Sequence, residues 1–207
     1  MKLFTLLLLI ICTASTWAQP QDNILILGDS LSAGYGIKVE ESWPVLIQEK
    51  LKQQDLSFNI HNASISGQTS AEGVAQIKQL LDLTQPKLVI IELGANDGLR
   101  GLAIQDMQHN LQTMITQSQL AGANVLLVGI RTPSNYGRRY GQMFSLSFLN
   151  LAKKNGISLV PFMLEPLTKI ITDANKSQYI QADGLHPTAK SQPILADYLF
   201  SFINKSL

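Results

Sequence analysis

Short runs of aliphatic residues alternate along the chain with longer segments whose apolar positions recur at helical spacing. The short runs predict strands at 24–27, 58–60, 88–93, 125–130 and 157–160. The longer segments predict helices at about 43–51, 72–81, 104–118 and 140–154. Strands that are apolar throughout and alternate with helices indicate a parallel sheet covered on both faces. We therefore predict an α/β protein of three layers, α/β/α, in which helices cover both faces of a parallel sheet of about five strands.

The expected helices start at residues that suit helix N-termini. Thr69 and Glu72 have the spacing of a capping box, in which each side chain accepts a hydrogen bond from the other's backbone. Ser42 precedes Trp43 as a candidate N-cap, and Pro187 stands at the expected first turn of the last helix.

The segment 1–18 has the pattern of a signal peptide. Lys2 is followed by an apolar run that extends to Cys12, and the segment ends at Ala18. The run is too short to span a bilayer as a helix. Two isoleucines precede Cys12 where a lipoprotein signal has small residues, so we interpret this cysteine as part of the apolar run. We expect cleavage after Ala18 and a periplasmic or secreted product.

Residues 19–207 are predicted to form a single domain that buries a core without a disulfide or a metal. The whole chain has 16 Lys and Arg against 15 Asp and Glu, so we expect no nucleic-acid partner. No later apolar run reaches the length of a membrane span, which argues against stable membrane insertion. We expect a monomer.

A candidate nucleophile, Ser30, follows the first predicted strand in the glycine-rich segment 28–36. The Gly-x-Ser-x-Gly elbow is absent, because Ser32 occupies the position of its second glycine. A dinucleotide fingerprint fails because Val39 replaces its third glycine. On this segment alone, Ser30 fits a nucleophile and a cap of the following helix equally well.

A serine nucleophile needs a base, and the chain offers three histidines. His109 falls on the polar face of its helix, where we expect solvent, and His61 at the end of the second strand fits a structural role. His186 differs because Asp183 stands three residues before it. One turn then brings the carboxylate to Nδ1 and leaves Nε2 free to face Ser30.

Acyl transfer also needs hydrogen-bond donors for the developing oxyanion. Gly67 and Asn96 follow the second and third predicted strands. A glycine lets its backbone N–H approach a substrate closely, and an asparagine amide donates directly. Each residue alone is explained equally well as part of a turn. Their shared position at the ends of neighbouring strands favours a site.

These four blocks resemble the SGNH, or GDSL, hydrolase family: Ser30 in Gly-Asp-Ser-Leu-Ser, Gly67, Asn96 in Gly-x-Asn-Asp, and His186 in Asp-x-x-His. The resemblance implies a flavodoxin-like sheet. It also implies that Ser30 is the nucleophile, that His186 is the general acid and base, and that Asp183 orients it. The N–H groups of Ser30 and Gly67 and the Asn96 side chain would form the oxyanion hole.

The resemblance further implies small-molecule substrates, namely fatty acyl thioesters, lysophospholipids and other acyl esters, with no metal and no cofactor. It implies that the loop 98–102 closes over the acyl chain. Two sets of side chains near these blocks bear on the substrate but are also explained by solvation or core packing. They are three arginines that could meet a phosphate (Arg131, Arg138, Arg139) and five apolar groups (Leu99, Leu102, Tyr136, Met143, Phe144).

Two alternatives stay open from the sequence. One is a carbohydrate O-acetylesterase of the same fold, which would act on short acyl groups. The other is a non-catalytic lipid or glycan binder, for which we would expect a broken triad, whereas Ser30, Asp183 and His186 are all present.

Overall fold

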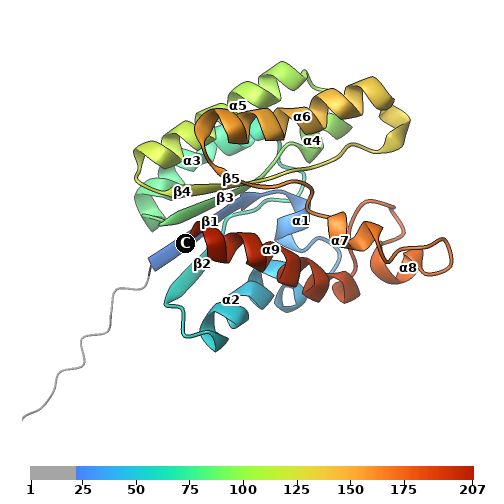
Figure 1. The fold of residues 1–207 in the computed structure, drawn as a ribbon, viewed down its shortest axis with the longest axis horizontal. Coiled ribbons are helices and arrows are strands. Elements are labelled where there is room, and N and C mark those ends of the chain that lie inside the picture. Colours follow the sequence, from blue (N-terminus) through green and yellow to red (C-terminus); the bar gives the residue numbers. More distant parts are fainter. Residues whose placement is uncertain (1–21) are drawn as a thin grey trace, which may run out of the picture.

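The computed structural model describes residues 22–207, so the predicted signal peptide lies outside the described residues. Five parallel strands form one sheet in the order β2-β1-β3-β4-β5 (Figure 1). The strands are β1 (Asp22–Gly28), β2 (Phe58–Asn62), β3 (Leu88–Glu92), β4 (Asn124–Val128) and β5 (Ser158–Val160). This is the flavodoxin-like order. All five predicted strands are confirmed, and within residues 22–207 no helix is both long and apolar enough to cross a membrane.

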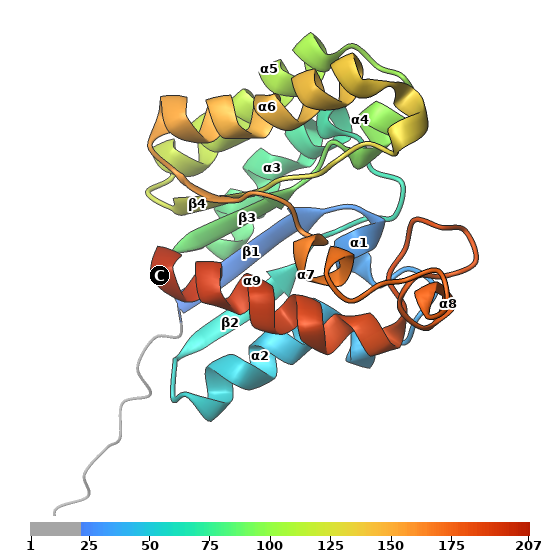
Figure 2. The same ribbon diagram turned by 45° about the vertical axis from the view of Figure 1, so that its right-hand side comes forward.

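Helices cover both faces of the sheet, as Figure 2 shows most clearly. One face carries α3 (Ser70–Thr84), α5 (Ile104–Leu120) and α6 (Arg138–Asn155), and the other carries α2 (Trp43–Gln53), α7 (Glu165–Thr168) and α9 (Gln192–Ser206). Short helices α1 (Ser30–Ala33), α4 (Ala95–Leu99) and α8 (Lys176–Tyr179) lie in connections. Three 3₁₀ turns, at Val39–Glu41, Ser134–Tyr136 and Ala189–Ser191, complete the elements of the described chain.

Alternation along β1 divides the core into two layers. Leu25 and Leu27 pack against the side of α3, α5 and α6, whereas Ile24 and Ile26 pack against α2 and α9. All four side chains are fully buried, because a strand's side chains alternate between the two faces and helices cover both. The central strands are therefore fixed on both sides, and the loops at their carboxyl ends start from a rigid base.

Of the three predictions for helix N-termini, one is confirmed in full, one is confirmed in position only, and one is wrong. Thr69 and Glu72 form the expected capping box, with the Thr69 N–H 2.7 Å from Glu72 Oε2. Ser42 occupies the N-cap position, but its hydroxyl donates to the Val39 carbonyl and does not cap the helix. The first N–H of α2, that of Trp43, instead donates to a side chain of α9.

The last helix starts later than predicted. Pro187 is not in a helical turn but pairs with Ile180 in an isolated antiparallel bridge. The Thr188 N–H donates to the Tyr179 carbonyl beside this bridge, and α9 begins only at Gln192. The prediction was wrong because a proline without an N–H suits an extended position in this bridge as well as a first helical turn.

Candidate active site

Ser30 is the first residue of α1, directly after β1. The preceding residue, Asp29, caps this short helix, because its Oδ1 accepts the Leu31 N–H at 3.1 Å. Gly34 ends the helix in the left-handed conformation, with φ of 76°. The capping role is thus taken by Asp29, and the Ser30 hydroxyl is left free to face the cavity beyond the sheet.

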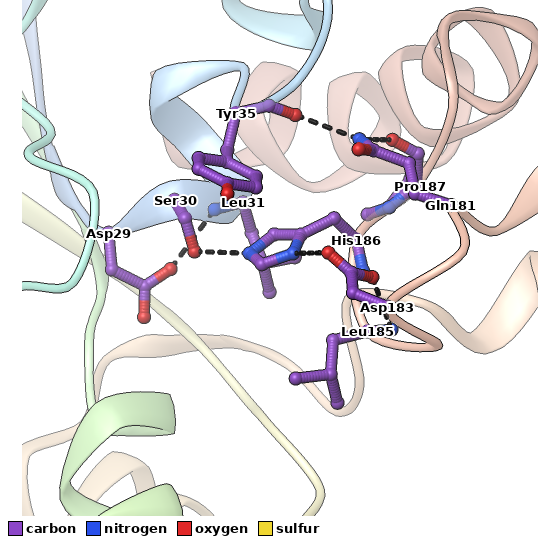
Figure 3. Close-up of polar contacts among 9 residues, drawn as sticks. All are labelled: Asp29, Ser30, Leu31, Tyr35, Gln181, Asp183, Leu185, His186 and Pro187. Carbon is purple, nitrogen blue, oxygen red and sulfur yellow. Dashed lines mark hydrogen bonds and ion pairs between the residues drawn. The ribbon is translucent and has the colours of Figure 1, made fainter.

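His186 links the hydroxyl of Ser30 to the carboxylate of Asp183 (Figure 3). Its Nε2 lies 2.8 Å from Ser30 Oγ, and its Nδ1 lies 2.6 Å from Asp183 Oδ2. We assign the proton to Nδ1, because a carboxylate only accepts and Nε2 can then accept the Ser30 proton. The geometry matches the arrangement expected from the Asp-x-x-His spacing.

Asp183 is held in its ionised form by the loop it belongs to. Its Oδ1 accepts the backbone N–H of His186 at 3.0 Å and that of Leu185 at 2.9 Å. These two bonds, followed by the bond to the His186 ring, lower the pKa of Asp183 to about 2. The carboxylate therefore stays charged at neutral pH and faces the imidazole.

The backbone N–H groups of Gly67 and Ser30 are unpaired hydrogen-bond donors near the Ser30–His186 pair. Both residues line the same cavity as His186. Within residues 22–207, neither the Ser30 N–H nor the Gly67 N–H donates to a protein acceptor. Gly67 has a φ of 84°, which strains any residue with a side chain. Its carbonyl accepts Arg100 Nη2 at 2.7 Å, which ties the loop after β2 to the loop after α4.

Asn96 lies in the same cavity, but its amide is already engaged. Nδ2 donates to Asp29 Oδ2 at 3.2 Å and to the Gln68 carbonyl at 3.0 Å. These bonds fix the amide between the loops that follow β1 and β2. Donation to a substrate therefore means that one of the two acceptors is shared or replaced.

Sequence reasoning missed two buried carboxyl groups beneath the nucleophile. Asp29 and Glu92 are both fully buried, and burial raises the pKa of Asp29 to about 6 and that of Glu92 well above its usual value. Glu92 Oε2 accepts the Ser32 hydroxyl at 2.7 Å, whereas Oε1 has no partner in the described chain. The sequence signal for Glu92 was an acidic residue ending an otherwise apolar strand, and Asp29 stood in the Gly-Asp-Ser block without a role of its own.

A cavity of about 600 Å³ opens beside Ser30 and is lined mainly by apolar side chains. Of the five apolar candidates from the sequence, Leu99 and Phe144 line it, and Leu102, Tyr136 and Met143 do not. The other apolar side chains in its wall are Leu31, Ala95, Ile130, Pro133, Phe162, Met163, Leu164 and Leu185. Tyr136 reaches the cavity rim indirectly, because its hydroxyl donates to the Leu99 carbonyl at 3.0 Å.

The three arginines do not gather at one site. Arg131 lines the cavity, with its guanidinium 4.4 Å from the centre of the Phe162 ring and 3.4 Å from Glu165. Arg138 lines a neighbouring hollow that Arg131 also borders, and Arg139 lines neither. His61, whose Nε2 lies 3.1 Å from Asn23 Oδ1, and His109 are also outside the cavity wall.

The chain is similar in sequence and fold to known esterases and thioesterases. An arylesterase of Vibrio mimicus is 42% identical over 97% of each chain. Thioesterase 1/protease 1/lysophospholipase L1 of Escherichia coli K12 is 42% identical over 88% of this chain and 83% of its own. The psychrotrophic esterase EstA from Pseudoalteromonas sp. has a crystal structure that matches with a TM-score of 0.81 and 41% identity, covering 89% of this chain and 97% of that one.

A sequence model of the GDSL-like Lipase/Acylhydrolase family matches residues 26–192, which include every block singled out above. The resemblance inferred from those blocks is confirmed, and so is the α/β/α fold that it implied. The chain belongs to the GDSL-like Lipase/Acylhydrolase family.

Proposed function

We propose that this protein is a serine hydrolase of acyl esters and thioesters that works through an acyl-enzyme on Ser30. The observation that carries the proposal is the continuous path from Ser30 Oγ through the His186 ring to Asp183. The names of the relatives, arylesterase and thioesterase/lysophospholipase, support the same reaction class. In this proposal Ser30 is the nucleophile, His186 is the general base and acid, and Asp183 orients it.

In the first half of the reaction, Ser30 Oγ attacks the carbonyl carbon while His186 Nε2 takes the hydroxyl proton. Charge develops on the carbonyl oxygen, and the N–H groups of Ser30 and Gly67, together with the Asn96 amide, donate to it. His186 then passes the proton to the leaving alcohol or thiol, and the C–O or C–S bond breaks. Asp183 stays ionised and stabilises the imidazolium.

In the second half, water replaces the leaving group. His186 removes a proton from the water as its oxygen attacks the acyl-enzyme carbonyl, and the same donors stabilise the second tetrahedral intermediate. His186 finally returns the proton to Ser30 Oγ, and the acid leaves. The apolar cavity of about 600 Å³ next to Ser30 is of the size and lining that suit an acyl chain.

We place this activity in the periplasm or outside the cell, because segment 1–18 has the features of a cleaved signal peptide. Residues 19–207 would then be the mature single domain.

Ser30→Ala tests the proposal. We expect p-nitrophenyl decanoate hydrolysis to fall to background, and a fluorophosphonate probe to label the wild type but not this variant. Ser66→Ala is the matched control, because Ser66 lines the same cavity without contacting His186, and it should be labelled and active. Turnover retained by Ser30→Ala would refute the assignment.

A further inference from the structure

The structure assigns Gln181 a positioning role in the reaction proposed above. It holds the histidine loop (residues 180–188) against the nucleophile turn (residues 29–36). This inference rests on the proposed function. Figure 3 shows the side chain of Gln181 between the two segments. Gln181 does not line the cavity beside Ser30, so it would affect the reaction by setting the positions of Ser30 and His186.

The amide nitrogen of Gln181 donates to two carbonyls from distant parts of the chain. One is the carbonyl of Tyr35, at 2.8 Å, in the turn that follows the helix of Ser30. The other is the carbonyl of Pro187, at 2.9 Å, directly after His186. An amide NH₂ group has two hydrogens, so both are used and the side chain bridges the two segments.

The backbone of Gln181 closes the histidine loop at its base. Its N–H donates to the His186 carbonyl at 2.8 Å, and its carbonyl accepts the Gly184 N–H at 3.0 Å. Asp183 and His186 are therefore held within one ring of hydrogen bonds, and the side chain of Gln181 connects this ring to the rest of the site. In the described chain, this is the only hydrogen bond besides the reacting Ser30–His186 pair that joins segment 29–36 to segment 180–188.

Gly36 makes room for this bridge. A Cβ at position 36 would lie 2.2 Å from Gln181 Oε1, so a side chain there would push the amide away. The Tyr35 ring adds a second contact across the same boundary, with its centre 4.5 Å from that of the His186 ring. Ring packing limits the tilt of the imidazole, whereas the Gln181 amide sets how close the loop comes to the turn.

The distance from Ser30 Oγ to His186 Nε2 decides the rate of proton removal, and a displacement of about 1 Å typically costs about 100-fold. The Asp183–His186 bond lies inside one loop and does not involve the side chain of Gln181. Loss of the bridge would thus separate an intact Asp183–His186 pair from Ser30. The expected signature is a loss of kcat with little change in KM.

Gln181→Met keeps the length of the side chain and removes both donors. We expect kcat on p-nitrophenyl esters to fall about 10- to 100-fold. KM should change less than threefold, and the loss should be equal for acetyl and decanoyl esters. Gln181→Glu should lose a similar factor, because a carboxylate would face two carbonyl oxygens. Gln48→Met is the matched control, since its amide bonds the Phe58 carbonyl far from the site, and it should keep its kcat.

A second pair of variants tests the bridge without altering Gln181, in case its replacement prevents folding. Gly36→Ala should lower kcat, because the new methyl group displaces the amide of Gln181. Gly122→Ala is its control, with a similar φ of 83° against 73° but no atom within 4 Å of the added Cβ. It should lose only stability.

The outcomes separate the two proposals. Wild-type turnover that disappears in Ser30→Ala supports the hydrolase whatever Gln181 does. If Gln181→Met and Gly36→Ala then keep kcat within threefold of their controls, the positioning role is overturned and Gln181 is only structural. If the wild type shows no turnover that depends on Ser30, the proposed function fails and the positioning role falls with it.

Discussion

The Asn96 side chain is held in place before any substrate binds, and under the proposed function it would donate to the oxyanion. Its amide is fixed by Asp29 and by the Gln68 carbonyl, so no side-chain freedom is lost on binding. We predict that Asn96→Ala lowers kcat on p-nitrophenyl decanoate by about 100-fold, which is about 3 kcal/mol of transition-state stabilisation. Circular dichroism should show an intact fold. A fall of less than about tenfold would exclude Asn96 as a donor.

The buried pair Asp29 and Glu92 gives the folded protein a pH dependence of its own. Their raised pKa values mean that the folded state binds protons more tightly than the unfolded chain. The stabilisation is complete below the ordinary pKa of Asp29, 3.8, and is lost as the pH rises through about 6. Glu92 shifts in the same direction. Carboxyl groups stabilised by salt bridges would show the opposite trend.

Glu92→Gln removes one of the two titrations. We expect the variant to be less stable than the wild type at pH 5, where its amide hydrogens lack an acceptor. The gap in the free energy of unfolding should shrink between pH 5 and pH 8, because ionisation of the buried Glu92 costs the wild type stability and the variant has no such ionisation. Urea unfolding at several pH values measures it. A gap that stays constant with pH would contradict the prediction.

The site residues found from the sequence are marked by local spacing, whereas those missed depend on contacts between distant parts of the chain. Asp183 and His186 are three positions apart, and Ser30 and Asn96 follow predicted strands, so spacing and chemistry identified them. The Gln181 amide bonds a carbonyl 146 positions away, and Glu92 meets a hydroxyl 60 positions away. Such pairings arise from tertiary packing, and no local sequence pattern predicts them.

At the scale of elements, Gly73 determines how closely α3 packs on its neighbours. A Cβ there would lie 2.5 Å from a Leu93 methyl carbon and 2.8 Å from the sulfur of Met114 on α5. In an exposed helix, Gly→Ala stabilises by about 1 kcal/mol. Here overpacking reverses the sign, and we predict that Gly73→Ala destabilises by about 1–3 kcal/mol.

Gly141 on α6 is the control for that helix interface. Its added Cβ would meet only the Thr132 hydroxyl, at 3.3 Å. We therefore expect Gly141→Ala to be neutral or stabilising in the same urea titration. Equal effects at the two positions would mean that α3 can move away from α5 without cost.

Elements were predictable where one physical rule acted alone. The central strands β1, β3 and β4 are buried along most of their length, so apolar runs identified them. The edge strands β2 and β5 are partly exposed, and shorter aliphatic runs still located them. The start of α9 was not predictable, because Pro187 and Pro193 both suit a first helical turn. Tertiary pairing of Pro187 with Ile180 decided between them.

At the scale of the molecule, the strand order explains why the site lies where it does. The chain moves outward from β1 to β2 and then returns to the other side of β1 as β3. The loops after β1 and β3 therefore leave the sheet in opposite directions, and a crevice opens between them. Ser30 follows β1 and Asn96 follows β3, on the two sides of that crevice. Alternating elements predicted the layers, and the flavodoxin-like order implied by the family resemblance is the order observed.

The cavity at this crevice leads to a prediction about chain length. Its wall is mainly apolar, and each methylene transferred from water into such a wall contributes about 0.8 kcal/mol, or roughly fourfold in kcat/KM. We expect kcat/KM to rise by about that factor per methylene from acetyl esters upward until the cavity is filled. Oxygen and sulfur leaving groups should give parallel series, because the acyl chain occupies the same wall in both. A carbohydrate O-acetylesterase of this fold would instead show its maximum at acetyl, and that result would replace the long-chain assignment while leaving Ser30 as the nucleophile.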